Sequence, residues 1–305
     1  VDKKIIDSIP EKLISSPFSH LHNNTQFSVL QSTSRIANIV KKAGESKTYC
    51  DEIKGIVISS DSSDTKIKPI IGCELNVCLN HKDKSNRDDG YQIVFLAKNK
   101  NGYRNLSKMC SVGYTEGFYY VPRVDREVVE KYMHGEIASK ILNIGESQAE
   151  DALLYWKNLF DKDFYLEMMR HGQEDEKRVN ENLIKFSSKH DVMVVPTNNS
   201  FYLNKEDANA HDILLCVKDG EKQSTPIGRG RGFRYGLPNQ EYYFKTSNEM
   251  KFLFKDYPEF FDNISEIVDK VEVYELARDV LLPKFTIPED FESDSDIDLE
   301  NEYLK

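Results

Sequence analysis

The stretch "ESQAEDALLYWKNLFDKDFYLEMMRHGQEDEKRVNENLIKFSSKHDVMVVPTN", residues 146–198, decides the fold because two helix patterns alternate in it with two strand patterns. The first helix pattern places Leu153 and Trp156 on one face. Each helix pattern is followed by a short apolar run, "DFYLEMM" at 163–169 and "VMVVPTN" at 192–198. Alternation of this kind predicts parallel strands covered by helices.

The same alternation extends over most of the chain and predicts an α/β fold, either a barrel or a doubly wound sheet. In a barrel, functional residues lie at the carboxyl ends of the strands, so these ends are the places to search. The further predicted strands are 53–59, 67–79 and 91–99, and the further predicted helices are 32–46, 101–116 and 204–220.

Composition narrows the possible functions of the 305 residues. The net charge of −10 argues against a dedicated nucleic-acid-binding module, which would be basic. The five cysteines are an odd number without a CxxC pair, which predicts reduced thiols in a cytoplasmic protein. No run of 18 apolar residues occurs in the sequence, so no membrane span is predicted.

A possible metal site begins at "FSHLHNNTQFSVLQ", residues 18–31, where His20 and His22 stand two apart on a predicted strand. A third imidazole at the next alternate position would complete a ligand pattern, but Asn24 occupies it. The motif is therefore either a working metal site or the remainder of one.

A loop rich in Gly, Arg and Pro is predicted at about 218–240. Its arginines Arg229, Arg231 and Arg234 alternate with aromatic residues, a pattern that can contact a nucleic-acid backbone and stack on bases. The alternative is that the loop packs on a neighbouring domain. The acidic character of the rest of the chain favours this second interpretation.

Several of these segments resemble one family, the PHP domain of the alpha subunits of bacterial DNA polymerase III. The resemblance rests on "FSHLHNNTQFSVLQ", "IKPIIGCE", "LAKNKNGYRNLSKMCSVGYTEGFYYVPRVD", "YLNKEDANAHDILLCVKDGE" and "LLPKF", which follow one another in the family's order. The segment "TPIGRGRGFRYGLPNQEYYF" is most similar to alpha subunits of Bacteroidetes-type bacteria.

The resemblance implies a distorted, TIM-like barrel of about seven βα units. It divides the chain into a lead-in at 1–17, the PHP barrel at 18–285, and an acidic linker at 286–305 toward a palm domain. In metal-bearing members, side chains at the strand ends hold up to three metal ions, which hydrolyse phosphodiesters and remove a 3′-terminal nucleotide.

Most of the ligand positions that the resemblance implies carry neutral residues in this chain. The family's His-x-His falls on His22 and Asn24, and its following aspartate falls on Gln31. A histidine position falls on Gln92, and the late Asn-Asp-x-His motif falls on residues 198–201, Asn-Asn-Ser-Phe. The glutamate of "IGCE" is retained as Glu74.

Two further family segments have no counterpart in the sequence. The Thr-Asp-His-Gly strand end is missing from residues 47–66, and the strand that precedes "GE" is missing from residues 130–140. Either the chain is shortened at these places, or the segments are missing from the sequence.

Replacement of Asp by Asn removes negative charge that a cluster of divalent cations requires. The chain is therefore expected to bind no metal cluster tightly. A single Zn or Mn ion on His20, His22 and Glu74 remains geometrically conceivable.

The family resemblance leads to two hypotheses of different classes. The first is a non-catalytic PHP domain of a replicative DNA polymerase, with a structural and docking role. The second is a metal-dependent phosphoesterase or 3′–5′ exonuclease with an altered ligand set. A third, a standalone binding domain, is disfavoured by the open-ended "LLPKFTIPEDF".

The first hypothesis carries expectations about the whole polymerase. Nucleotidyl transfer with Mg would occur in the palm, downstream of residue 305. The resemblance implies DNA, a proofreading exonuclease subunit and the sliding clamp as partners, together with the palm and thumb domains of the same chain.

Overall fold

The computed structural model of the chain describes residues 3–6, 8–45, 68–133, 137–141, 146–228 and 230–276. Several sequence predictions therefore lie outside the described residues. These are the strand at 53–59, the linker beginning with "LLPKF", and the position of Arg229. Residues up to Tyr274 form one compact unit. The division into lead-in, barrel and linker remains a prediction.

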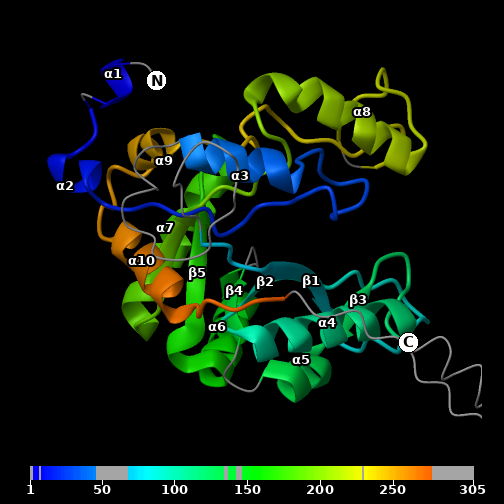
Figure 1. Cartoon of the computed structure of the whole chain (residues 1–305). Coiled ribbons are helices and arrows are strands. Elements are labelled where there is room, and N and C mark those ends of the chain that lie inside the picture. Colours follow the sequence, from blue (N-terminus) through cyan, green and yellow to red (C-terminus); the bar gives the residue numbers. More distant parts are fainter. Residues whose placement is uncertain are drawn as a thin grey trace, which may run out of the picture. The chain divides into compact units, whose positions relative to one another are not determined.

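A six-stranded mixed sheet forms the centre of the described chain (Figure 1), with the strand order β3-β1-β2-β4-β5-β6. Strand β1 pairs antiparallel with β2 and parallel with β3, whereas β4 is antiparallel to β2 and parallel to β5. Strands β5 and β6 are parallel. The strands are β1 Gly72–Cys78, β2 Tyr91–Ala97, β3 Arg123–Asp125, β4 Ile137–Ile141, β5 Phe164–Met169 and β6 Met193–Thr197.

The α/β class is confirmed, but the described residues contain no closed barrel. The predicted parallel pairing is found for β1–β3, β4–β5 and β5–β6, whereas β1–β2 and β2–β4 are antiparallel. The polar segment 79–90 joins β1 to β2 without a helix, so the two strands form an antiparallel pair. Both strands are apolar runs, and an apolar run alone does not distinguish parallel from antiparallel pairing.

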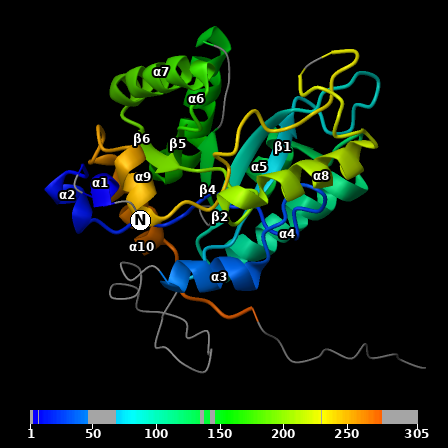
Figure 2. The ribbon, with the colours of Figure 1, turned by 90° about the horizontal axis from the view of Figure 1, so that it is seen from above.

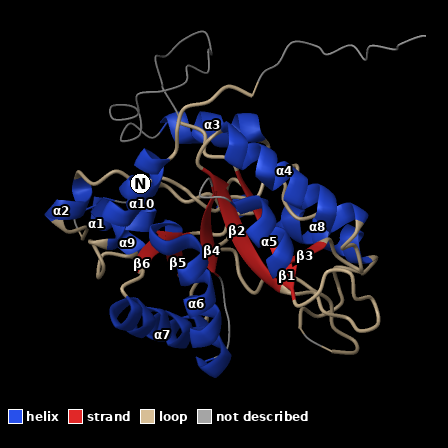
Figure 3. Cartoon of the chain, turned by 90° about the horizontal axis from the view of Figure 1, so that it is seen from below, coloured by secondary structure: helices blue, strands red, loops and turns tan. Residues whose placement is uncertain are grey.

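Helices surround the sheet, as Figure 3 shows. Helix α4 packs on β1 and β2, α6 on β4 and β5, α7 on β5 and β6, and α10 on β6. In Figure 2, α6 and α7 lie side by side near β5. The helices are α1 Lys3–Ile6, α2 Glu11–Ile14, α3 Ile36–Glu45, α4 Lys100–Thr115, α5 Arg126–Met133, α6 Glu146–Phe160, α7 Glu174–His190, α8 Ala208–Asp219, α9 Ser247–Leu253 and α10 Phe260–Lys270.

The helix ends follow local chemistry. The side chain of Asn99 accepts hydrogen bonds from the backbone N–H groups of Asn101 and Gly102 and so begins α4. A capping box of Asn204 and Asp207 begins the short 3₁₀ turn before α8, and Gly220 ends α8 in the left-handed conformation. The predicted helix at 204–220 is thus confirmed with its first turn in 3₁₀ form.

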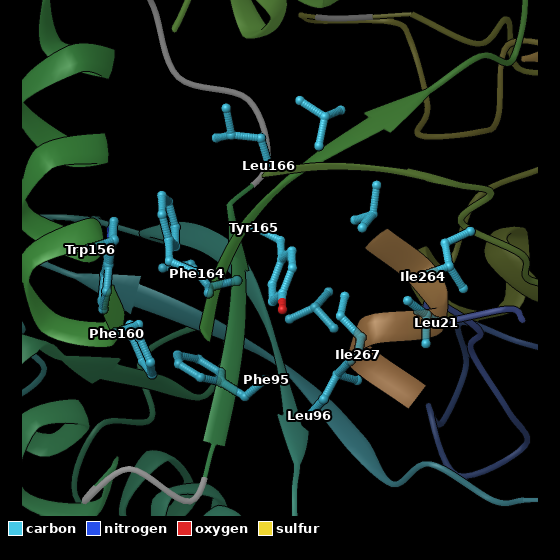
Figure 4. Close-up of a cluster of buried hydrophobic side chains, with 14 of the residues drawn as sticks. Leu21, Phe95, Leu96, Trp156, Phe160, Phe164, Tyr165, Leu166, Ile264 and Ile267 are labelled. Atoms are coloured by element: carbon cyan, nitrogen blue, oxygen red, sulfur yellow. The ribbon is translucent and has the colours of Figure 1, made fainter. Parts of the chain in front are cut away.

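The core lies where the sheet meets α6 and α10, and Figure 4 shows its aromatic centre. Phe95 of β2 and Phe164 of β5 are buried completely or nearly so. Trp156 of α6 packs against Phe160, with 5.9 Å between the ring centroids. Burial of such aromatic side chains stabilises the fold by roughly 2–3 kcal/mol each. The sheet and its strand ends therefore form a rigid support for polar residues.

Candidate functional site

The opening motif and the late motif lie side by side at one end of the sheet. Residues around His22 run extended beside the segment that follows β6, and Asn23 forms an isolated β-bridge with Ser200. The Asn24 backbone N–H donates to the Ser200 carbonyl at 2.8 Å, and the Ser200 N–H donates to the His22 carbonyl at 3.4 Å. Two segments far apart in sequence thus form one polar cluster.

His22 lies between two carboxylates at this cluster. Its Nδ1 is 3.1 Å from Glu167 Oε1 and 3.3 Å from Glu167 Oε2. Its Nε2 is 3.7 Å from Glu74 Oε2. Only 4% of His22 and 2% of Glu167 are exposed. Strand β1 supplies Glu74 and strand β5 supplies Glu167, so the sheet fixes both carboxylates relative to the imidazole.

The two carboxylates set the charge of His22. Burial by itself lowers the pKa of the imidazole, but the charge and hydrogen bonds of Glu167, together with the nearby charge of Glu74, outweigh it and raise the pKa to about 9. His22 is therefore an imidazolium at neutral pH. The Thr197 hydroxyl also donates to Glu167 Oε1, which leaves this carboxylate well supplied with hydrogen bonds.

His20 belongs to a different environment from His22. Its Nε2 donates to the Lys245 carbonyl at 2.7 Å, and its ring lies 4.1 Å from the Phe244 ring and 4.9 Å from the Phe18 ring, centroid to centroid. Burial lowers the pKa of His20 to about 4, so this imidazole is neutral. The structure brings His22 and Glu74 together but places His20 in aromatic packing, outside the predicted trio.

Amides interact where the family resemblance implies charged ligands. The Asn24 Nδ2 group donates to Asn199 Oδ1 at 2.7 Å, and these are the positions of the family's second histidine and late aspartate. Asn198 Nδ2 donates to the Tyr243 carbonyl at 2.8 Å, and the buried Lys245 ammonium donates to Asn198 Oδ1 at 3.3 Å. The neutral side chains of Asn24, Asn198 and Asn199 and the ammonium of Lys245 therefore form hydrogen bonds at this end of the sheet.

The remaining implied ligand positions contribute no side chain to the cluster. Gln31 and Gln92 are exposed, and the carbonyl of Gln31 accepts a hydrogen bond from His211 Nε2 at 2.7 Å. The ring of Phe201 lies 5.5 Å from the His211 ring, centroid to centroid. In the part of the chain that the structure describes, no three or more His, Cys, Asp and Glu side chains are grouped so as to hold a metal ion.

Comparison with known proteins agrees with these motifs. The sequence matches the PHP domain family over residues 20–171. The chain belongs to the PHP-domain family. It is 34% identical to the DNA polymerase III subunit alpha of Borreliella burgdorferi in an alignment of 298 residues. This alignment covers 90% of this chain and 26% of that protein. The corresponding proteins of Treponema pallidum and Thermus aquaticus are each 32% identical, over 90% and 89% of this chain and 25% and 24% of their own lengths.

These relatives are DNA polymerase III alpha subunits, and the chain spans about a quarter of their length. Within the described ranges, none of the helices has the length and apolar character needed to cross a membrane.

Sequence reasoning missed Glu167, although a signal was present. Glu167 lies inside the apolar run "FYLEMM", where both faces of the strand are buried. A charged residue inside such a strand requires a partner, because burial of an unpaired carboxylate is costly. The missing partner was His22, which lies 145 residues away in the sequence.

The two described arginines of the 218–240 loop, Arg231 and Arg234, differ in their exposure to solvent. Arg231 is exposed, whereas Arg234 is buried and forms a bidentate ion pair with Asp212 of α8 at 2.7 and 2.9 Å. Arg234 Nε also donates to the Thr225 carbonyl at 2.8 Å. The guanidinium of Arg234 thus holds the loop on α8 and does not face solvent, where a DNA phosphate or another domain would have to bind.

Proposed function

We propose that the chain is the PHP portion of a DNA polymerase III alpha subunit in which a hydrogen-bonded polar cluster has replaced the metal site. The observation that carries the proposal is the contact between Asn24 and Asn199 beside the buried His22–Glu167 pair. Two positions where the family resemblance implies metal ligands hold each other through neutral amide groups.

Electrostatics supports the replacement. A cluster of divalent ions requires several carboxylates and neutral imidazoles, because its positive charge must be offset. Here the carboxylates Glu74 and Glu167 already flank an imidazolium, and the ammonium of Lys245 lies next to Asn198. The positive charge in the cluster is supplied by the protein's own side chains.

A metal ion would also have to compete with a proton at His22. Because the pKa of His22 is raised to about 9, removal of its proton at pH 7 costs roughly 3 kcal/mol. A metal ligand must be deprotonated, so this cost reduces the affinity for a metal. Metal binding at His22 is therefore disfavoured even where the geometry would permit it.

The proposed role of the domain is structural. The name of the relatives, DNA polymerase III subunit alpha, supports a place in a replicative polymerase of the cytoplasm, with DNA as the substrate of the whole protein. In that protein the domain would brace the palm and thumb and offer a docking face to a proofreading exonuclease subunit and to the sliding clamp. Magnesium-dependent nucleotidyl transfer would take place in the palm.

The experiment is a cleavage assay with the purified chain and with the intact polymerase that contains it. A primer with a 3′ mismatch is incubated with either protein in Mn²⁺, Zn²⁺ or Mg²⁺, without an exonuclease subunit. We expect no removal of the mismatched nucleotide above the background of a His22→Ala variant. Metal-dependent removal that His22→Ala abolishes would overturn the proposal.

The position of Glu167 favours a second candidate, a phosphoesterase with an altered ligand set. Glu167 lies at Nδ1 of His22 and Glu74 lies at Nε2, so a single ion could bind one ring nitrogen and only one of these carboxylates, and only after His22 lost its proton. This candidate requires that Glu167→Gln abolish hydrolysis. Glu176→Gln is the matched control, because Glu176 pairs with His171 at 2.7 Å in a similar but separate His–Glu contact.

A further inference from the structure

Two partly buried cysteines meet between a strand and a helix on the PHP domain. Cys73 of β1 and Cys110 of α4 have their Sγ atoms 3.4 Å apart, although the two residues are 37 positions apart in the sequence. Both side chains are neither fully buried nor fully exposed. Two neighbouring thiols thus lie on residues that are partly exposed to solvent.

The packing of α4 against β1 creates this proximity (Figure 3). Cys73 and Cys110 both contact the edge of the apolar core, which fixes the strand and the helix relative to each other. A disulfide requires the two sulfur atoms to approach to about 2.05 Å. The two sulfur atoms, at 3.4 Å, must therefore approach by roughly 1.3 Å before they bond.

The other described cysteines are not placed in this way. Cys78 is buried and its thiol donates to the Val124 carbonyl at 3.3 Å, and Cys216 is buried on α8. Among the four cysteines that the structure describes, Cys73 and Cys110 are the pair whose sulfur atoms are in contact.

We propose that Cys73 and Cys110 are a thiol-modification site that a small-molecule disulfide, such as oxidised glutathione, converts into an intrachain disulfide. One cysteine, as a thiolate, attacks a sulfur of the oxidant and forms a mixed disulfide, releasing one reduced glutathione. The second cysteine loses its proton, attacks the protein sulfur of the mixed disulfide and expels the second glutathione. The two thiols are oxidised, and one oxidised glutathione is reduced to two thiols.

The bridge would fasten the strand that carries Glu74 to helix α4, because Glu74 follows Cys73 directly in β1. A covalent link across 37 residues also restricts the unfolded chain, so the oxidised protein should be more stable than the reduced one. This inference is independent of the metal site, since it needs neither a metal ion nor any nuclease activity.

The test incubates the native chain with oxidised glutathione, blocks the remaining thiols, digests the protein without reductant and identifies linked peptides by mass. We expect one linked peptide pair that contains Cys73 and Cys110 and weighs two hydrogens less than the two reduced peptides together. The pair should persist in Cys50→Ser and Cys216→Ser and vanish in Cys73→Ser and Cys110→Ser. The oxidised wild type should also unfold at a higher urea concentration than the reduced protein.

Three results would overturn the proposal. The first is that both thiols remain free under conditions that oxidise a small dithiol. The second is that a mixed disulfide with glutathione persists on either cysteine without closing the bridge. The third is that the linked peptides contain a different pair of cysteines. Circular dichroism of Cys73→Ser and Cys110→Ser confirms that each variant is folded before its result is used.

Discussion

At the scale of single residues, the structure gives opposite charges to two histidines that stand two positions apart. His22 faces two carboxylates and is charged, whereas His20 packs among aromatic rings and is neutral. The difference arises from the partners that the fold provides, because His22 is buried against carboxylates, whereas His20 is partly buried among aromatic rings. We therefore expect the two histidines to change the free energy of unfolding in opposite directions as the pH changes.

His22 should make the folded state less stable as the pH rises above neutrality. Its pKa rises from 6.5 to about 9 on folding, so its contribution is fully present below pH 6.5 and is lost as the pH approaches 9. The full contribution amounts to at most about 3 kcal/mol. Urea unfolding of the wild type and of His22→Gln, at several pH values from 6 to 9.5, measures it. Equal pH slopes for the two proteins would contradict the assigned charge.

His20 should make the folded state less stable as the pH falls below 6.5. Its pKa falls from 6.5 to about 4 on folding, so its contribution is present above pH 6.5 and is lost as the pH falls toward 4. We expect His20→Phe to lose less stability than the wild type between pH 6.5 and 4.5, because Phe takes up no proton. The same unfolding series tests it, with His22→Gln as the matched variant. A wild type and a His20→Phe protein with equal acid sensitivity would show that His20 is not the group responsible.

At the scale of elements, the loop at 218–240 depends on one buried arginine. Arg234 joins the loop to α8 through Asp212 and through backbone carbonyls, while Arg231 extends into solvent. Sequence alone grouped these arginines by their common spacing with aromatic residues. It could not separate them, because the partner Asp212 lies 22 positions earlier, on a helix.

Removal of Arg234 should therefore destabilise the domain, and removal of Arg231 should not. Arg234→Ala leaves the partly exposed Asp212 carboxylate without its ion-pair partner but with the hydrogen bond from Gln223, at a cost of roughly 1–3 kcal/mol. Arg231→Ala, at an exposed position, should change the free energy of unfolding by less than about 0.5 kcal/mol. Denaturant unfolding of both variants gives the comparison. Equal stability losses, or none, would contradict the described role of Arg234.

Much of the element pattern was predictable from sequence, and the reasons are local. The strands at 163–169 and 192–198, and the helix that precedes each of them, follow from apolar periodicity, and the structure confirms them as β5, β6, α6 and α7. The hairpin of β1 and β2 was not predictable in this way. Its strands are buried apolar runs, and their relative direction depends on the connection between them.

At the scale of the whole molecule, the fold brings the opening and late motifs together, and neutral residues stand at most of the ligand positions that the family resemblance implies. The Asn23–Ser200 bridge joins these two motifs. The neutral residues at the implied ligand positions could be identified from sequence, and so could the retained Glu74. The pairing of His22 with Glu167 required the fold, since β5 alone places that carboxylate beside the imidazole.

The affinity of the cluster for a metal ion should depend on pH in a specific direction. As the pH rises from 7 toward 9, His22 loses its proton and the cost of metal binding falls. Any weak binding of Zn²⁺ or Mn²⁺ at His22 should therefore strengthen toward pH 9 in the wild type and be absent in His22→Gln. Calorimetric titration at the two pH values measures the effect. Binding that is equally tight at both pH values would contradict it.

The most direct test of the central claim is the number of metal ions bound per chain. The purified protein is dialysed at pH 7 against micromolar Mn²⁺ or Zn²⁺, and protein-bound metal is measured by mass spectrometry of the elements, with Glu167→Gln and His22→Gln in parallel. The account predicts far less than one ion per chain in the wild type. Two or three ions per chain, lost in both variants, would contradict it.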